Sequence, residues 1–287
     1  MARLSIPKTY KLYIGGKFPR SESGHTFEVV TPQGKFLANA AKASRKDARD
    51  AVASARSAQA GFAGLTAYNR GQILYRIAEV LEGRRDQFVD EIRASEGVNA
   101  QAAARQVEHA IDTWVWYAGF ADKYAQVAGN GNPVAGPYFN LSTPEATGVV
   151  VALAPAGAKG ESLLGPSAVL APIMTSGNAT VLLAHPTQPL SAISFAEVLA
   201  TSDVPAGVVN ILTGDPEPLM PWLAAHADVN ALDLSGGSAS DWVAWQSDAA
   251  ETLKRVVPPT VGIPARSLER IVAFTETKTV WHTKALG

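Results

Sequence analysis

The sequence predicts an α/β fold built on a doubly wound parallel sheet with helices on both faces. Four runs between residues 148 and 235 are short, rich in β-branched residues or Leu, and apolar on both faces. Gly/Pro turns and helical segments separate these runs, as in sheets built from repeated strand–helix units. The expected strands are GVVVALAP (148–155), ATVLLA (179–184), GVVNILT (207–213) and NALDLS (230–235).

The chain ahead of this sheet is expected to form a β-rich arm and then helices. Residues 11–44 alternate apolar stretches with Gly, Pro and polar residues, which favours short hairpins. Ser44 and Asp47 have the spacing of a capping box, and the Ala-rich run that follows to Gly61 favours a helix. Three more helices are expected: one capped by Thr66, one through Phe88, and a long one from about Ala100.

A hairpin is expected between these helices and the sheet, at residues 132–150. It contains a Gly-Pro turn followed by the run Tyr138–Ser142. An ordinary surface hairpin is one interpretation. Alternating aromatic side chains exposed on a sheet edge favour a contact surface, so we prefer an interface.

The last part of the sequence predicts one helix and one extended segment. Residues 238–257 favour a helix that stops at Pro258-Pro259. A connector rich in Pro and Gly, VVPPTVGIPARS, leads into residues 269–283, a run of β-branched residues that favours a strand.

Composition limits the classes of function. The 287 residues are 47% hydrophobic with a formal net charge of −1, as in globular proteins without an electrostatic footprint for nucleic acid or an anionic membrane. We find no apolar run of membrane-spanning length and no hydrophobic export segment, so we expect a cytoplasmic location. The sequence has no cysteine, which excludes disulfides, thiolate metal sites and a thiol nucleophile.

Four motifs resemble, in order and spacing, the cofactor domain of the NAD(P)-dependent aldehyde dehydrogenases: GVVVALAP, TSGNATVLLAHPTQPLSA, VPAGVVNILTG and AAHADVNALDLSGGS. The resemblance extends to the N-terminal arm and to a final strand similar to FTETKTV. It implies a Rossmann-type domain at residues 1–131 and 148–258, and a small β oligomerisation flap at 132–147 and 265–287. The family's catalytic domain is expected to be absent, and the family's final strand at the end of this sequence favours a natural protein over a cloned fragment.

The resemblance also shows what the expected ligand crevice lacks after its first two strands. Family members carry Pro-Trp-Asn in the first turn, where the Asn donates to the oxyanion, and this sequence has Pro155, Ala156 and Gly157. The family's second turn carries a Lys and usually a Glu that hold the adenosine ribose, and Leu183 and Pro186 stand at these positions. Neither of these two side chains can make the corresponding hydrogen bonds.

The remaining turns also depart from the family. The sequence has Gly214 and then Asp215–Pro218 where a second glycine is usual, and Gly237 in place of a Ser that contacts the pyrophosphate. Prolines lack amide donors, and carboxylates at a helix start repel a pyrophosphate. Glu161, expected in the first turn of the helix after the first strand, adds to this repulsion, which Lys159 could partly offset.

We therefore expect no catalytic, cofactor-binding or metal-ligating residue. The family's Cys nucleophile and Glu-Leu-Gly-Gly motif are both missing. A substitute set of Ser162, His185 and Asp215 remains an alternative, although nothing in the sequence brings them together. His109 is isolated from other ligand-type residues, which favours a structural or solvated role.

The function we expect is that of an inactive aldehyde dehydrogenase-like subunit that builds an assembly. It resembles the second, non-catalytic module of fused two-module aldehyde dehydrogenases, and its partner would be a full-length aldehyde dehydrogenase or, by self-association, a second copy. The alternative is a protein or oxidoreductase that binds NAD(P) or another nucleotide in an altered crevice. The expected interface residues are Tyr138, Phe139, Asn140, Leu141, Ser142, Phe274, Thr275, Thr277, Lys278, Thr279 and Val280.

Overall fold

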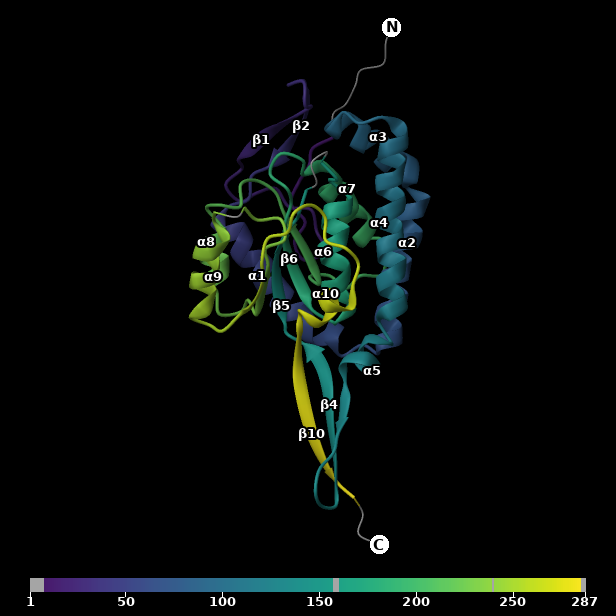
Figure 1. Ribbon diagram of the computed structural model, residues 1–287. Helices are drawn as coiled ribbons and strands as arrows, with labels where there is room; N and C mark the ends of the chain where they lie inside the picture. Colours follow the sequence, from purple (N-terminus) through teal and green to yellow (C-terminus); the bar gives the residue numbers. More distant parts are fainter. Residues whose placement is uncertain (1–7, 157–159, 239, 285–287) are drawn as a thin grey trace.

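The computed structural model describes residues 8–156, 160–238 and 240–284. Its centre is a five-stranded sheet in the order β7-β6-β5-β8-β9, and each neighbouring pair runs parallel (Figure 1). The predicted parallel sheet is therefore confirmed. The strands are β5 (Val149–Leu153), β6 (Ala179–Leu183), β7 (Val209–Leu212), β8 (Ala231–Asp233) and β9 (Arg255–Val257).

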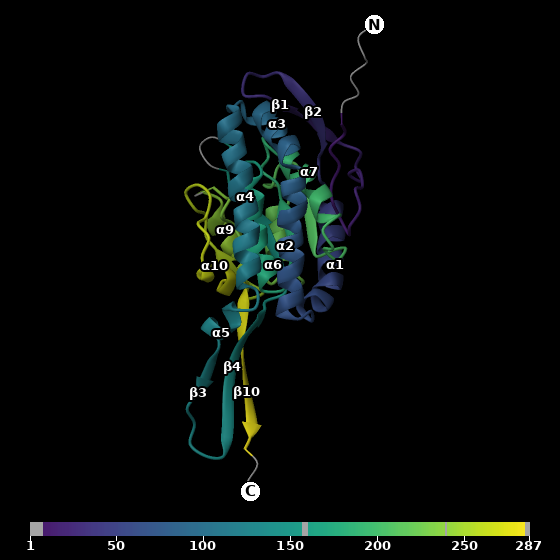
Figure 2. The same cartoon turned by 90° about the vertical axis from the view of Figure 1, so that its right-hand side faces the viewer.

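Helices cover both faces of this sheet, as expected for a doubly wound fold (Figures 1 and 2). Alternate residues of β5 enter two different clusters of buried side chains: Val150 packs with α2, α4, α6 and α7, and Val151 packs with α1, α8 and α9. The helices are α1 (Arg45–Ala63), α2 (Ala67–Gly83), α3 (Arg85–Glu96), α4 (Ala100–Phe120), α5 (Tyr124–Ala128), α6 (Leu164–Thr175), α7 (Leu190–Leu199), α8 (Met220–Ala225), α9 (Trp242–Ala250) and α10 (Leu268–Val272).

The N-terminal arm contains the expected hairpin and covers one edge of the sheet. Strands β1 (Thr26–Val30) and β2 (Phe36–Ala41) pair antiparallel. Ahead of them, Tyr13 exchanges main-chain hydrogen bonds of 2.9 and 2.7 Å with Ile211 of β7. The predicted capping box at the start of α1 is present, since the Ser44 and Asp47 side chains each bond the other residue's amide.

A three-stranded antiparallel sheet, hereafter the flap, projects from one end of the body (Figure 2). It consists of β10 (Thr275–Thr283), β4 (Tyr138–Ala146) and β3 (Asn130–Asn132), in that order. The expectation that Tyr138–Ser142 lies on a sheet edge is wrong, because β4 is the central strand. Strand β10 shields it along all nine positions, so the long open edge of the flap belongs to β10.

The helix predicted over residues 238–257 is shorter than expected. Helix α9 ends at Ala250, and Leu253 has a left-handed backbone with φ 51°. Residues 255–257 instead form β9, which hydrogen-bonds beside β8. The two valines of β9 favour the extended backbone, and the sheet supplies hydrogen-bond partners that override helix propensity.

A buried ion pair fastens the end of the chain to this sheet. Asp233, at the end of β8, is fully buried and accepts a 2.5 Å hydrogen bond from Arg270 of α10. The hydroxyl and amide of Ser235 also donate to Asp233, and Arg270 in turn donates to the Ser235 hydroxyl at 3.1 Å. Because β10 begins three residues after α10 ends, at Thr275, this network also sets where the flap leaves the body.

Arg270→Met is expected to lower the free energy of unfolding by about 3–5 kcal/mol, because it leaves the Asp233 carboxylate buried without its cation. The matched control is Arg255→Met, which removes an exposed ion pair with Glu276; such pairs are worth about 0–1 kcal/mol. Urea unfolding followed by tryptophan fluorescence measures both variants. Equal losses would contradict the structural role given to the Asp233–Arg270 pair.

Candidate functional site

The carboxyl ends of β5, β6, β7 and β8 form the edge at which open parallel sheets bind ligands. The chain after β5 runs through Pro155, which is buried, and Ala156, which is half-buried. Two positions of the prediction lie outside the described residues. They are Gly157, which replaces the oxyanion donor of the family, and Lys159, which was expected to offset the charge of Glu161. The structure tests the other positions of this crevice directly.

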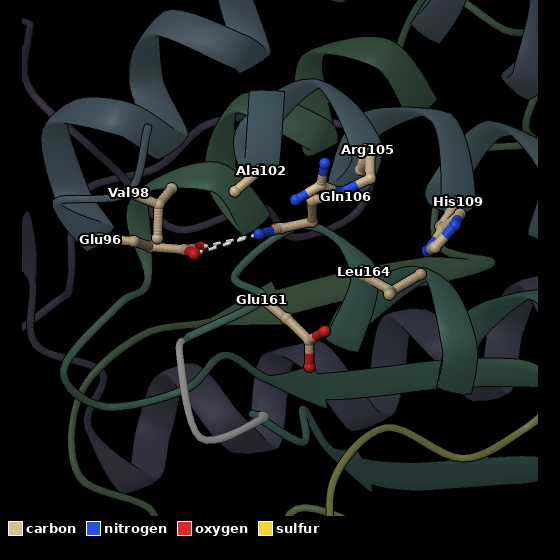
Figure 3. Close-up of a pocket in the computed structure, with 8 residues that line it drawn as sticks. All are labelled: Glu96, Val98, Ala102, Arg105, Gln106, His109, Glu161 and Leu164. Carbon is tan, nitrogen blue, oxygen red and sulfur yellow. Dashed lines mark hydrogen bonds between the residues drawn. The ribbon is translucent and has the colours of Figure 1, made fainter. Parts of the chain in front are cut away.

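The amides at the start of α6 are occupied by side chains of this chain. The Ser162 amide donates to the carboxylate of Glu96 at 2.8 Å, and the Leu163 amide donates to the side-chain oxygen of Gln106 at 2.9 Å. Gln106 also donates to Glu96, at 3.0 Å (Figure 3), and both side chains are buried. Of the amides next to the start of α6 that could face a phosphate, those of Ser162, Leu163 and Gly165 are therefore already bonded within the protein.

Glu161 does not lie in the first turn of this helix, contrary to expectation. Helix α6 begins at Leu164, while Glu161 has a left-handed backbone with φ 65° and its carbonyl accepts the Gly165 amide at 2.9 Å. The helix starts late because it packs directly on the end of β5. A Cβ added at Gly165 would lie 1.9 Å from the Pro155 carbonyl oxygen.

Glu96, Arg105, His109 and Glu161 line a pocket beside this helix start (Figure 3). Burial raises the pKa of Glu161, the negative charge of Glu96 raises it further, and His109 opposes both effects. Two carboxylates at a helix start disfavour a bound phosphate. Within residues 8–156, 160–238 and 240–284, no group of three or more His, Cys, Asp or Glu side chains is placed to hold a metal ion.

Leu183 and Pro186 stand at the end of β6, where the resemblance implies ribose-binding residues. Leu183 is buried, and Pro186 is exposed to solvent. His185 lies between them, with its Nδ1 atom 3.1 Å from the Thr187 hydroxyl. Burial lowers the pKa of His185, which keeps its ring neutral at pH 7.

The ends of β7 and β8 are closed by other segments. The Thr213 carbonyl accepts the Ala43 amide at 2.9 Å, and the Thr213 hydroxyl donates to the Ala41 carbonyl at 2.5 Å, so the N-terminal arm seals β7. At β8, a Cβ added at Gly236 would lie 2.5 Å from the carbonyl group of Ala154. Close packing of two strand ends therefore explains this glycine without a ligand.

The connector between β9 and α10 crosses this edge of the sheet (Figure 1). Its Thr260 amide donates to the Ser235 carbonyl at 3.2 Å, and the Ser267 amide donates to the Tyr117 hydroxyl of α4 at 3.4 Å. Between these points the Ile263 side chain comes within 3.6 Å of the position that a Cβ of Gly165 would occupy. The connector thus spans the distance from β8 across α6 to α4.

The alternative set of Ser162, His185 and Asp215 is not assembled. The Ser162 hydroxyl donates to the Ser191 hydroxyl at 2.9 Å, and His185 is bonded to Thr187. The Asp215 carboxylate accepts the amide of Glu217 at 3.0 Å, in a local turn. Each of the three side chains is engaged elsewhere, so the described geometry supports no nucleophile–base pair.

The two faces of the flap carry different side chains. One face is apolar near the tip: Phe139 is 56% exposed, Leu141 is 45% exposed, and Val280 lies opposite Leu141. The other face carries a polar ladder in which Asn132 donates to Ser142 at 2.8 Å and Ser142 bonds to Thr279 at 2.9 Å, and it ends at the tip in the exposed aromatic pair of Tyr138 and Trp281. The face with Phe139 and Leu141, hereafter the apolar face, is the candidate for a protein contact.

Three predicted interface residues are covered by the chain itself. Phe274 is fully buried in the core, Thr275 is buried at the base of β10, and Asn140 is buried and accepts a hydrogen bond from Asn132. Their side chains therefore offer a partner almost no surface. The other predicted interface residues stay a prediction.

Sequence reasoning also missed one exposed residue of the flap. Trp281 is 59% exposed and makes an edge-to-face contact with Tyr138, with 5.9 Å between the ring centres. The extended run that predicted interface residues up to Val280 continues to Trp281, so the sequence contained a signal for this residue. Glu96, Gln106 and Arg270 carried no local signal, since their partners are distant in the sequence.

Comparisons with known proteins agree with this architecture. HpcC from Thermus thermophilus superposes with a TM-score of 0.81 and 27% identity, covering 88% of this chain and 48% of that chain. A putative aldehyde dehydrogenase from Burkholderia cenocepacia has a TM-score of 0.81 and 26% identity over 86% and 50%. PnpE from Pseudomonas sp. WBC-3, in complex with nicotinamide adenine dinucleotide, has a TM-score of 0.80 and 27% identity over 86% and 50%.

This chain therefore spans about half the length of the solved structures that it resembles. The described helices include none with the length and apolar character needed to cross a membrane. The model of the Aldehyde dehydrogenase family matches residues 18–260, from the N-terminal arm to the connector after β9. On this match, which covers most of the sequence, the protein belongs to the aldehyde dehydrogenase family.

Proposed function

We propose that this protein is a catalytically inactive aldehyde dehydrogenase homologue that serves as a structural subunit of an assembly with a full-length aldehyde dehydrogenase. One observation carries the proposal: the crevice is closed by the chain's own side chains, while the flap leaves an apolar face and a long strand edge uncovered. Glu96 and Gln106 occupy the helix start in the crevice. Phe139 and Leu141 are exposed on the flap.

The missing chemistry supports the inactive state. Acyl-enzyme catalysis needs a nucleophile activated by a base, and the resemblance to the family implies a cysteine in that role. The sequence contains no cysteine. Of the alternative nucleophiles, Ser162 donates to the Ser191 hydroxyl, and among the described residues no histidine bonds it. A hydroxyl is not a general base, so this contact does not activate Ser162.

The same crevice disfavours a dinucleotide. A pyrophosphate at the start of α6 would have to replace the carboxylate of Glu96 or lie beside it and Glu161. Two like charges 4 Å apart repel by about 4 kcal/mol at the effective dielectric of a protein surface. The buried Ser162 and Leu163 amides would also have to give up their hydrogen bonds to Glu96 and Gln106 for hydrogen bonds to the phosphate. Such an exchange gives little net gain in binding free energy.

Titration of the purified chain with NAD+ and NADH by calorimetry is expected to give no saturable binding below about 1 mM, equivalent to a binding free energy weaker than about −4 kcal/mol. A full-length aldehyde dehydrogenase, titrated under the same conditions, is the control. Micromolar affinity would contradict the proposed closure of the crevice.

Such an affinity would favour the alternative, an NAD(P)-binding protein or oxidoreductase with an altered crevice. The likeness to PnpE, whose structure holds nicotinamide adenine dinucleotide, is the observation in its favour. Turnover of an aldehyde by the chain alone would select the oxidoreductase, and binding without turnover would select the binding protein.

The flap supplies the contact in the proposed assembly. Interface cores are depleted in charge and enriched in aromatic side chains, which matches the tip of the flap, where Phe139 and Leu141 are exposed on one face and Trp281 on the other. At its base the flap is anchored by ion pairs between Lys278 and Glu145 (2.9 Å) and between Arg255 and Glu276 (2.6 Å). The tip can thus insert into a partner while charged residues remain at the solvated rim.

Co-purification from the native source is expected to recover a full-length aldehyde dehydrogenase with the tagged chain. Replacing Phe139 and Leu141 together by Asp should weaken this complex at least about tenfold, because binding would then bury unpaired carboxylates. Tyr75→Asp is a matched control, since Tyr75 is 54% exposed on α2, away from the flap. Equal recovery with both variants, or a lone chain from the native source, would contradict the proposal.

A further inference from the structure

A buried carboxyl group joins the N-terminal arm to two helices. Glu91 of α3 accepts a 2.6 Å hydrogen bond from the Ser194 hydroxyl of α7 and a 3.4 Å hydrogen bond from the Tyr10 hydroxyl of the arm, both at Oε2. Its second oxygen, Oε1, is buried and has no hydrogen-bond partner among the described residues. Such an oxygen is far more costly to bury on a charged carboxylate than on a neutral carboxyl group.

Lys8 strengthens this attachment from the side of the arm. Its ammonium group donates to the same α7 hydroxyl at 3.1 Å and forms an ion pair of 2.7 Å with Glu197 of α7. It also lies over the Tyr10 ring, 4.7 Å from the ring centre. Arg84, between α2 and α3, pairs with the other oxygen of Glu197 at 2.6 Å. Glu91 is thus surrounded by titratable groups from the arm, from α7 and from the start of α3.

The attached arm covers the edge of the five-stranded sheet. The Tyr10 amide donates to the Asn39 carbonyl at 3.3 Å, and the Tyr10 carbonyl accepts the Ala41 amide at 2.9 Å. Three residues further along, Tyr13 bonds Ile211 of β7 through its main chain. The residues that contact Glu91 therefore lead directly into those that cover β7.

We propose that Glu91 makes the attachment of the N-terminal arm depend on pH. The arm lies most firmly on α3 and α7 while Glu91 is neutral, and loss of its proton loosens residues 8–14 from the edge of β7. This inference goes beyond the proposed function and does not rest on it, because it concerns the arm and β7 rather than the crevice or the flap.

The direction of the pH dependence follows from the surroundings of Glu91. Burial raises the pKa of Glu91 in the attached arm, and the nearby hydroxyls and the charge of Lys8 oppose this effect without cancelling it. When the arm detaches and water reaches the carboxyl group, its pKa returns towards that of an exposed glutamate, about 4.3. Attachment therefore takes up a proton. The contribution of Glu91 to attachment is present at low pH and is lost as the pH rises through its raised pKa.

Glu197 sets the acidic limit of this attachment. Burial acts to raise the pKa of Glu197, but its contacts with Lys8 and Arg84 outweigh burial and lower it. The ion pair with Lys8 therefore supports attachment above the ordinary pKa of a glutamate and is lost as the pH falls through the lowered value. Burial, together with the charge of Glu91, raises the pKa of Tyr10, so its hydroxyl remains a donor throughout. Attachment is strongest between the lowered pKa of Glu197 and the raised pKa of Glu91.

Hydrogen exchange of β7 measures the attachment, because the Ile211 amide donates to the Tyr13 carbonyl at 2.7 Å. The central strand β6 serves as the internal reference, since its exchange reports global unfolding. After correction for the intrinsic pH dependence of exchange, the protection of β7 relative to β6 is expected to fall at least about threefold between about pH 5 and pH 8.

Two substitutions at Glu91 test whether this group is responsible. Glu91→Gln and Glu91→Met cannot titrate, so the relative protection of β7 should no longer change over this pH range. The matched control is Glu28→Gln, at an exposed glutamate of the same arm, which should keep the fall of the unmodified chain. Lys8→Met should lower the relative protection but keep its fall with rising pH, because it removes the ion pair with Glu197 and leaves Glu91 able to titrate.

A relative protection that stays constant or rises between about pH 5 and pH 8 in the unmodified chain would overturn the inference. So would an unchanged fall in both Glu91 variants. A variant that does not fold is recognised by lost protection in β6, and the other variant and the unmodified chain then decide. None of these measurements involves a full-length aldehyde dehydrogenase, so the proposed function stands or falls separately.

Discussion

The buried pair of Asp233 and Arg270 connects the two parts of this protein. The carboxylate sits at the end of a central strand, where a parallel sheet offers its ligand crevice, and the guanidinium comes from the short helix that precedes β10. Breaking such a pair leaves an uncompensated buried charge, so the connector, α10 and the base of β10 are held in one arrangement. This one interaction therefore joins the end of the sheet to the base of the flap.

The crevice follows a general requirement that buried polar groups find partners. Just before α6, the buried amides of Ser162 and Leu163 donate to Glu96 of α3 and Gln106 of α4. In a ligand site such amides donate to solvent or to a phosphate. In a packed sheet end they donate instead to side chains of the protein itself.

Local patterns predicted the parts of this fold that depend on local physics. The β-branched runs located four strands, and the spacing of Ser44 and Asp47 located a helix start. The prediction for residues 255–257 was wrong because three residues are too few to show a strand pattern next to a predicted helix. Their strand state depends on pairing with the neighbouring strand β8.

The site depended more on distant contacts. Sequence positions alone showed that Leu183 and Pro186 lack donors, since this follows from residue type. The partnership of Glu96 with the Ser162 amide joins residues 66 positions apart, and that of Asp233 with Arg270 joins residues 37 apart. No spacing rule connects such residues. The central position of β4 was equally hidden, because it depends on the return of β10 from the far end of the sequence.

The edges of the five-stranded sheet differ from the outer edge of β10 in the flap. The edge at β7 is covered by Tyr13, and β9 is only three residues long and is followed at once by Pro258-Pro259. Natural edges are blunted by such covers, prolines, bulges or charges. Strand β10 has no proline and pairs with β4 without a bulge, and its Lys278 turns its main chain inward. With nine residues, β10 is the longest edge strand among the described residues, and an edge of this length is a template for strand pairing.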